Sequence, residues 1–262
     1  MRAVEAGDLL FERHGRVAWV TFNRPDARNA MTFDMYDDLH DLCEAVDGDP
    51  EVRVVVVRGA GDQSFAAGTD IRQFLTFETR EDALGHEARI GRVLRRLAAL
   101  TKPTIAMVQG DAVGGGLFLA LACDLRFVAD HARFGAPVAR TLGNCTAPFS
   151  FTLLASTVGL VRAREILLRA RLVGAKEAKT VGLADEVYPS GELEGRVREQ
   201  AEKLTEHAPL TMAAVKEATR RVREQFALDD AEDIILSCYL SQDFKEGARA
   251  FLEKRKPNWQ GR

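Results

Sequence analysis

The chain has 262 residues, of which 46% are apolar and 29% are charged, a composition typical of a soluble globular protein with a sizeable core. Its 36 Lys and Arg residues against 39 Asp and Glu residues give a net charge of −3, and the basic residues are scattered along the sequence. This charge pattern lacks the basic field that nucleic-acid binding requires and therefore argues against that class of function.

The sequence also argues against export, membrane insertion and metal binding. The N-terminal segment MRAVEAGDLLFERHG contains acidic residues and no apolar stretch of signal-peptide length. No run approaches the roughly 18 apolar residues that a membrane-spanning helix needs. The cysteines are Cys43, Cys123, Cys145 and Cys238, and they form no CxxC pair. They therefore favour neither a metal cluster nor a disulfide framework, and a reducing, cytoplasmic setting is expected.

Strand and helix patterns alternate in the first two thirds of the chain. A hairpin is expected from strands 9–13 and 17–22, and Thr32 is a suitable N-cap for a helix that Gly48-Asp49-Pro50 ends. The same alternation predicts an α/β fold. The further strands are expected at 52–57, 104–108 and 125–128, and the further helices at 82–100, 114–122, 149–158 and 162–168.

From about residue 192 the pattern changes to helices without intervening strands. Helices are expected at 192–207, 209–223, 228–240 and 242–254. Such a run predicts a helical layer whose apolar stripes are buried on the α/β body or on another subunit. We therefore divide the chain into a core at 1–191 and a C-terminal helical region at 192–262.

Two glycine turns carry the strongest chemical signal. Each follows a short strand and opens a helix: FAAGTDI lies at 65–71, and GDAVGGGLF lies at 110–118. The first turn of a helix has N–H groups without helical acceptors, so each motif offers donors to a negative charge. Aimed at one point, such donors form an oxyanion hole, which is worth about 3–4 kcal/mol per donor in a transition state. No GxxxxGK[ST], GxGxxG or GxSxG motif is present.

Together with other segments, these turns closely resemble the crotonase superfamily, the enoyl-CoA hydratase/isomerase family. The resembling segments are FNRPDARNAM at 22–31, VVVVRG at 54–59, KPTIAMVQG at 102–110, ACDLRFVADHARFGAP at 122–137, AKEAKTVGLADEV at 175–187 and FLEKRKPNW at 251–259. The resemblance implies a spiral of ββα units and C-terminal helices that form a trimer or a dimer of trimers. It also implies an acyl-CoA thioester substrate, with coenzyme A as part of that substrate and no separate cofactor or metal.

The resemblance assigns the oxyanion N–H groups to Thr69 and Gly115. It places the acyl-CoA beside the first turn, beside NRPDARNA and, at the nucleotide, near the C-terminus. The corresponding residues are Ala67, Gly68, Asp70, Ile71 and Arg72 of the turn, Arg28 and Ala30 of NRPDARNA, and Lys254. Phe118, Val138 and Arg140 are also expected to contact the substrate. For the basic residues, solvated surface charge is an equally good interpretation.

The chain departs from the hydratase pattern where the chemistry is decided. Hydratases of this family use two glutamates, and the corresponding positions here are Phe118 and Val138, which suit an apolar pocket and cannot transfer a proton. Glu87, on the expected helix 82–100, is a candidate replacement, or else it forms an ion pair, for instance with Arg140. Cys145 falls where related dehalogenases carry a nucleophilic aspartate, although a small buried cysteine is the simpler interpretation. His86 is expected at the surface.

Three functions stay open on this basis. The first is an enoyl-CoA hydratase/isomerase-like activity on CoA thioesters. The second is a different reaction of the same family on a CoA thioester, such as isomerisation, hydrolysis, or decarboxylation of a malonyl-type substrate. The third is a CoA-ligand-binding homologue without catalysis. Because Phe118 and Val138 replace the two glutamates, hydration itself is the least expected reaction.

Overall fold

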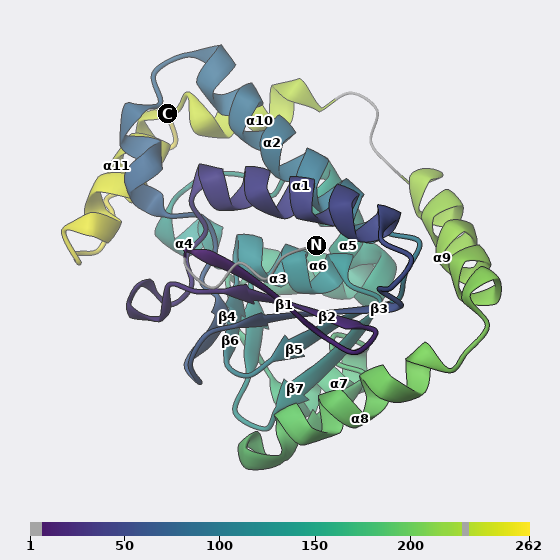
Figure 1. The fold of residues 1–262 in the computed structure, drawn as a ribbon. Coiled ribbons are helices and arrows are strands. Elements are labelled where there is room, and N and C mark those ends of the chain that lie inside the picture. Colours follow the sequence, from purple (N-terminus) through teal and green to yellow (C-terminus); the bar gives the residue numbers. More distant parts are fainter. Residues whose placement is uncertain (1–6, 227–230) are drawn as a thin grey trace.

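The computed structural model describes residues 7–226 and 231–262, which form two β-sheets surrounded by helices (Figure 1). The strands are β1 (Leu9–His14), β2 (Val17–Phe22), β3 (Val54–Gly59), β4 (Ser64–Ala66), β5 (Thr104–Val108), β6 (Asp111–Val113), β7 (Leu125–Ala129), β8 (Arg133–Gly135), β9 (Val173–Gly174) and β10 (Glu186–Tyr188). The α-helices are α1 (Phe33–Gly48), α2 (Arg80–Ala98), α3 (Gly115–Ala122), α4 (Val138–Thr141), α5 (Pro148–Val158), α6 (Leu160–Leu168), α7 (Ala175–Val181), α8 (Leu193–Thr205), α9 (Pro209–Glu224), α10 (Glu232–Tyr239) and α11 (Gln242–Leu252). The 3₁₀ helices are η1 (Pro25–Ala27), η2 (Ile71–Thr76) and η3 (Ser190–Glu192).

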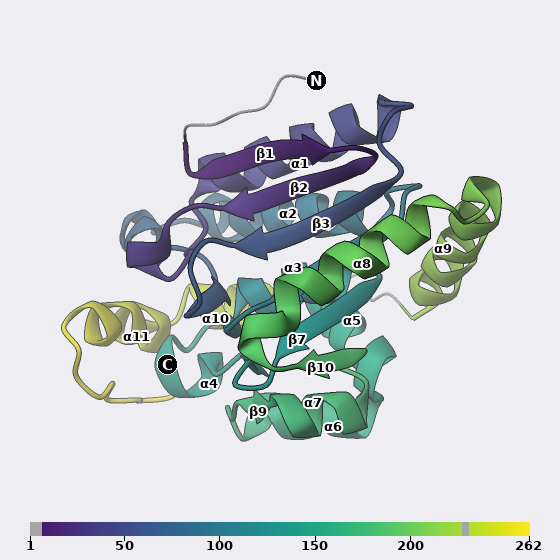
Figure 2. The same cartoon turned by 60° about the horizontal axis from the view of Figure 1, so that its bottom comes forward.

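The larger sheet has the strand order β1-β2-β3-β5-β7-β10 and is parallel except for the β1–β2 hairpin. The strands β2, β3 and β5 are apolar without alternation because both faces of this sheet are covered. Helices α1 and α2 lie on one face, and α8 lies across the other (Figures 1 and 2). The expected α/β fold is confirmed, and Thr32 caps α1 by accepting a hydrogen bond from the Met35 N–H.

The smaller sheet has the order β4-β6-β8-β9 and is built from strands of two or three residues. Each of its first three strands directly follows a strand of the larger sheet, so the chain winds through β3–β4, β5–β6 and β7–β8 before entering a helix. This winding is the expected spiral of ββα units. It brings the ends of β4 and β6 together, and the two glycine turns follow those ends.

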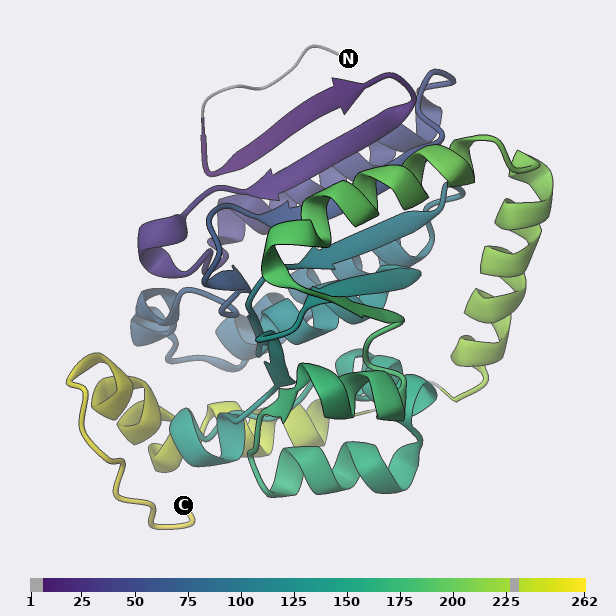
Figure 3. The same ribbon diagram turned by 90° about the horizontal axis from the view of Figure 1, so that it is seen from below.

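The C-terminal helices occupy three different places. Helix α8 packs on the larger sheet, and its Val197 and Ala201 belong to the main core. Helix α9 stands to one side and has no fully buried residue (Figure 3). Helices α10 and α11 pack on α2 and η2 around a smaller apolar cluster of Phe74, Ala83, Ile235, Tyr239 and Phe244.

Helix formation after residue 192 is thus confirmed for the described residues, with residues 228–230 of the expected helix 228–240 lying outside them. Within the described parts of the chain, no helix has the length and apolar character needed to cross a membrane.

Candidate active site

A cavity of about 310 Å³ lies where the two glycine turns, α2 and α10 meet. Thr69 and Gly115 of the two turns, Glu87 of α2 and Tyr239 of α10 all line this cavity. Helices α3 and α4 and the loop that follows α4 also contribute to its lining. Residues that lie far apart in the sequence therefore line one cavity.

The two glycine turns pack backbone against backbone. Gly68 has a φ of +96° and Gly114 a φ of +57°, conformations that glycine adopts without strain. A Cβ added to Gly115 would lie 3.7 Å from the Thr69 nitrogen and only 2.6 Å from the hydroxyl of Tyr36. Within the described ranges, neither the Thr69 nor the Gly115 N–H donates to a backbone acceptor. Two free donors therefore lie close together at the cavity wall.

The segment between β2 and α1 is hydrogen-bonded to the residues around the first glycine turn, 65–71. Asn29 is fully buried, and its amide donates to the carbonyl oxygens of Ala60 and Ser64 at 3.0 and 2.7 Å. The Arg28 carbonyl accepts from the Ala67 N–H at 3.0 Å, which ties the two segments together.

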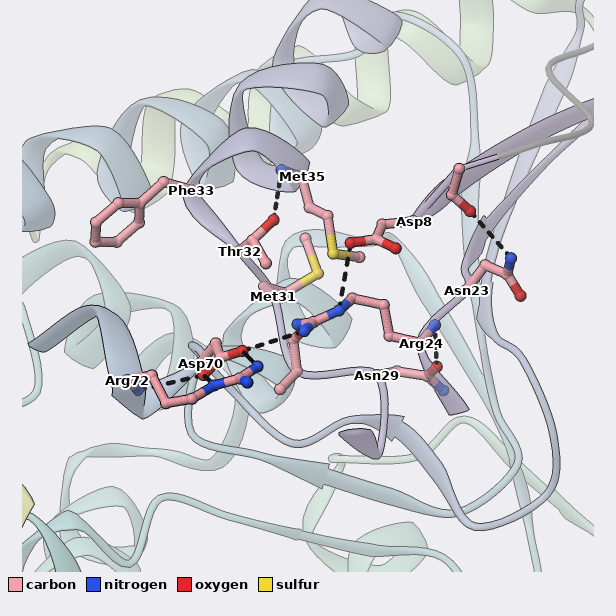
Figure 4. A network of polar contacts seen from close by, with 12 residues as sticks. Asp8, Asn23, Arg24, Asn29, Met31, Thr32, Phe33, Met35, Asp70 and Arg72 are labelled. Atoms are coloured by element: carbon pink, nitrogen blue, oxygen red, sulfur yellow. Dashed lines mark hydrogen bonds and ion pairs between the residues drawn. The ribbon is translucent and has the colours of Figure 1, made fainter. Parts of the chain in front are cut away.

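An ion-pair network holds the start of η2 beside this segment (Figure 4). Asp70 caps η2 and accepts from Arg72 at 2.9 and 2.5 Å and from Arg24 at 3.2 Å. The hydrogen bonds from Arg72 and Arg24 lower the pKa of Asp70 to about 2, although partial burial opposes them. Asp70 and Arg72 therefore pair with each other and do not line the cavity.

Phe118 of α3 and Val138 of α4 both line the cavity. Phe118 is almost fully buried, and Val138 is half-buried. Neither side chain can donate or accept a proton, so this wall only excludes water and contacts apolar groups.

Glu87 is a buried carboxyl group in the cavity and belongs to a hydrogen-bond chain. The Tyr239 hydroxyl donates to Glu87 Oε1 at 2.5 Å, and Asn144 Nδ2 donates to the Tyr239 oxygen at 3.1 Å. Burial raises the pKa of Glu87 to about 7, even though the hydrogen bond from Tyr239 lowers it. Both protonation states of Glu87 are consequently populated near neutral pH, as an acid–base catalyst requires.

The ion pair between Glu87 and Arg140 does not form. Arg140 is exposed on α4, and the partner of Glu87 is Tyr239. Asp111 is the other carboxylate of the cavity lining, and Arg133 of β8 holds it with bonds of 2.8 and 2.6 Å. Glu87 is thus the carboxyl group of this lining that is free of a cationic partner.

The surface position expected for His86 is wrong. His86 is 5% exposed and packs among the rings of Phe33, Phe74, Phe77 and Tyr239. Burial lowers its pKa to about 3, so the imidazole is neutral. Residues 83, 86, 87 and 90 are spaced so that they share one face of α2, and all four are buried. This spacing could have shown from the sequence that residues 86 and 87 point inward.

Cys145 lines the cavity but is a poor nucleophile. The nearby thiol of Cys238 on α10 and burial both raise the pKa of Cys145. A cysteine reacts as the thiolate, which is not accessible for Cys145 at neutral pH.

The remaining predicted binding residues divide into two groups. Arg28, Ala67, Gly68 and Ile71 line the cavity. Ala30, Asp70, Arg72, Arg140 and Lys254 lie outside its lining, and Arg72, Arg140 and Lys254 are exposed. Tyr239 and Asn144 were missed as site residues, because Tyr239 is 152 residues from Glu87 in the sequence and no local pattern links them.

Comparison with known proteins places this geometry in a family. The sequence matches the profile "Enoyl-CoA hydratase/isomerase" over residues 12–262. It is 36% identical over 259 residues to the short-chain-enoyl-CoA hydratase of Clostridium acetobutylicum, with 97% of each chain covered.

Two solved structures share the whole fold. A methylmalonyl-CoA decarboxylase in complex with 2-nitronate-propionyl-CoA superimposes with a TM-score of 0.87 at 28% identity, covering 98% of this chain and 99% of that one. An enoyl-CoA hydratase from Mycobacterium avium subsp. paratuberculosis superimposes with a TM-score of 0.85 at 33% identity, covering 97% and 99%. The profile match, the sequence identity and the shared fold all span nearly the full chain, which therefore belongs to the enoyl-CoA hydratase/isomerase (crotonase) family of enzymes acting on CoA thioesters.

Proposed function

We propose that this enzyme moves the double bond of an enoyl-CoA thioester by a 1,3-proton transfer, with Glu87 as the acid–base group. The N–H groups of Thr69 and Gly115 hold the thioester oxygen. The observation that carries the proposal is the buried Glu87, whose pKa lies near 7 and which shares the cavity with these two donors. One carboxylate is sufficient for isomerisation, whereas hydration in this family uses two.

The reaction starts with a 3-enoyl-CoA and ionised Glu87. The carboxylate removes a proton from Cα, and the electron pair of that bond forms a dienolate whose negative charge lies on the thioester oxygen. The N–H groups of Thr69 and Gly115 stabilise this charge. Protonated Glu87 then delivers the proton to Cγ, the double bond shifts from Cβ–Cγ to Cα–Cβ, and the carboxylate is restored.

The test follows the conjugated thioester absorbance after a 3-enoyl-CoA is added to the purified protein. We expect this absorbance to rise with multiple turnovers. The same sample in deuterium oxide should show exchange at Cα by NMR, since the intermediate is an enolate. Acyl-CoA binding without absorbance change or exchange would contradict the proposal and identify a CoA-binding homologue without catalysis.

Hydration of crotonyl-CoA should be absent or slower by orders of magnitude than in a hydratase with two glutamates. A positioned acid or base contributes about 10²–10⁴-fold, and Phe118 and Val138 contribute none. The joint loss is less than multiplicative, because the pair acts on one water. The assay is the disappearance of the conjugated absorbance, and rapid hydration by the wild type would refute this assignment of the acid and base.

Decarboxylation of a malonyl-type thioester is the second candidate, favoured by the fold shared with a methylmalonyl-CoA decarboxylase at a TM-score of 0.87. In that reaction the C–C bond electrons form the enolate, carbon dioxide leaves, and protonated Glu87 donates its proton to Cα. The apolar Phe118 and Val138 would desolvate the departing carboxylate. Release of carbon dioxide from methylmalonyl-CoA without isomerisation of a 3-enoyl-CoA would replace the first proposal with this one.

Tyr239→Phe should move the acid limb of the rate profile to higher pH. Isomerisation begins with ionised Glu87, so kcat/KM falls as the pH drops below the Glu87 pKa of about 7. The Tyr239 hydrogen bond lowers this pKa, and its removal therefore raises it. The measurement is kcat/KM against pH for the variant, the wild type and the control Tyr188→Phe on β10. An unshifted profile in Tyr239→Phe would remove this residue from the site.

A homo-oligomer, a trimer or a dimer of trimers, is also proposed. Helix α9 and the start of α6 expose large apolar side chains, including Leu160 (64%), Leu210 (84%) and Val215 (63%). Leu160 and Val215 border a groove of about 970 Å³ between α5 and α9, and monomers rarely expose such a surface. Light scattering should give three or six times 28.9 kDa, and Val215→Asp should lower the mass. A 28.9 kDa wild type at micromolar concentration would contradict the proposal.

A further inference from the structure

The loop between α4 and α5 and the first turn of α5 contribute polar side chains to the cavity lining. Asn144, Thr146 and Ser150 all line it. Leu142 of the same loop packs against the smaller apolar cluster that contains Tyr239. The loop is therefore anchored beside the Tyr239 side chain that contacts Glu87.

The chemistry of its partner determines how the Asn144 amide is oriented. The Tyr239 hydroxyl has one proton and donates it to Glu87 Oε1 at 2.5 Å, so it can only accept from Asn144. Asn144 Nδ2 makes this contact at 3.1 Å, and Asn144 Oδ1 is left buried without a hydrogen-bond partner among the described residues. A buried carbonyl oxygen of this kind is rare in folded proteins, because leaving it unpaired costs stability. The cavity lining thus contains an acceptor that lacks a donor.

Ser150 supplies a hydroxyl group without a partner to the same cavity. It is 4% exposed, yet its hydroxyl makes no hydrogen bond within residues 7–226 and 231–262. Thr152 of the same helix donates to the Pro148 carbonyl, four residues earlier, at 3.0 Å. Four residues before Ser150 lies Thr146, which belongs to the loop and not to the helix. Ser150 therefore lacks the helical acceptor that Thr152 has, and its O–H is available to a ligand.

The charges around these groups favour a neutral ligand group. Residues 141–150 contain no Lys or Arg. His86 also lines the cavity, and burial lowers its pKa to about 3, so it is uncharged. A carboxylate bound beside Asn144 would add a second negative charge near Glu87 without a cation from this loop. A hydroxyl group, in contrast, can donate to Asn144 Oδ1 and accept from Ser150.

We propose that the acyl group of the substrate carries a hydroxyl at Cδ or Cε, recognised by Asn144 Oδ1 and the Ser150 O–H. Both residues line a cavity of about 310 Å³, small enough for a short acyl chain to reach them. Glu87 acts at Cα and Cγ, and Asn144 is one hydrogen-bonded residue further away, so the recognised group lies beyond Cγ. The position of the reacting carbons rests on the proposed function, whereas recognition of the hydroxyl is an equilibrium binding event.

The test measures dissociation constants by calorimetry for pairs of saturated thioesters in which a methyl group replaces the hydroxyl. The pairs are 5-hydroxypentanoyl-CoA with hexanoyl-CoA and 6-hydroxyhexanoyl-CoA with heptanoyl-CoA. In at least one pair we expect the hydroxylated thioester to bind about 10-fold or more tightly, which corresponds to about one net hydrogen bond. Saturated thioesters cannot be isomerised, so this result is independent of proton transfer by Glu87.

The outcomes separate this proposal from the proposed function. Equal or tighter binding of the methyl thioester in both pairs, together with turnover of a 3-enoyl-CoA, would overturn hydroxyl recognition alone. Absence of binding by all four thioesters would overturn the placement of an acyl-CoA in this cavity and both proposals with it.

Two variants test the assigned residues. Ser150→Ala and Asn144→Leu should each reduce the preference for the hydroxylated thioester by about 10-fold, the effect of losing one net hydrogen bond. The affinity for the methyl thioester should stay unchanged in Ser150→Ala, which shows that the pocket is intact.

The matched control is Ser156→Ala on the same helix. Ser156 is exposed, donates to the Leu153 carbonyl at 3.1 Å and lies outside the cavity lining, so the wild-type preference should remain. A wild-type preference in both Ser150→Ala and Asn144→Leu would contradict the assignment of these two residues.

Discussion

Replacing Glu87 by Gln should lower isomerisation of a 3-enoyl-CoA by about 10²–10⁴-fold, the typical contribution of a positioned acid or base. The amide cannot take a proton from Cα, although it retains the size of Glu87 and can still accept the hydrogen bond from Tyr239. Acyl-CoA affinity should stay unchanged, because the Thr69 and Gly115 donors and the apolar wall are unaltered. The measurement is kcat for the isomerisation together with the dissociation constant of butyryl-CoA.

The matched control for this variant is Glu81→Gln. Glu81 lies in the first turn of the same helix and is exposed, so its replacement should leave kcat at the wild-type value. Full activity in Glu87→Gln would exclude Glu87 as the proton-transfer group. Loss of butyryl-CoA affinity along with kcat would mean that Glu87 shapes the pocket instead of transferring the proton.

Removing the N–H of Gly115 should cost about 10²–10³-fold in kcat, the effect of losing one oxyanion donor. Proline removes this donor and is tolerated in the first turn of a helix, where Gly115 begins α3. A Cβ at this position would lie 2.6 Å from the Tyr36 hydroxyl, so the substitution belongs in a Tyr36→Phe background.

The control is Gly115→Ala in the same Tyr36→Phe background, which distinguishes the effect of losing the N–H donor from the effect of adding a Cβ. Alanine brings the Cβ but retains the N–H, and we expect it to keep most of the activity of the background protein. Proline and alanine with equal kcat, both folded by circular dichroism, would show that the Gly115 N–H does not bind the thioester oxygen.

Several elements were determined by local sequence alone. The strands β2 and β5 were predicted with their observed bounds, because their β-branched and apolar runs end at turn residues. Thr32 and the Gly48-Asp49-Pro50 break set the ends of α1 in the same way. Strands β9 and β10 were not predicted, since two or three residues are too few to show a periodicity.

The placement of the C-terminal helices was decided by tertiary structure. Helices α8 and α9 are both amphipathic and adjacent in sequence, yet Val197 of α8 is fully buried on the sheet while Val215 of α9 is 63% exposed. A helical stripe shows that a face must be covered and does not identify the surface that covers it.

The candidate site also has parts that the sequence predicted and parts that only the tertiary structure decided. The sequence showed the two glycine turns directly, and the family resemblance predicted that Phe118 and Val138 replace the two glutamates, because each of these features lies within a continuous motif. Only the fold could show that Tyr239 reaches Glu87 across 152 residues and that Asn144 supports it. The protonation of Glu87 depends on this burial and on these partners, so its pKa near 7 is a property of the tertiary structure that no local segment encodes.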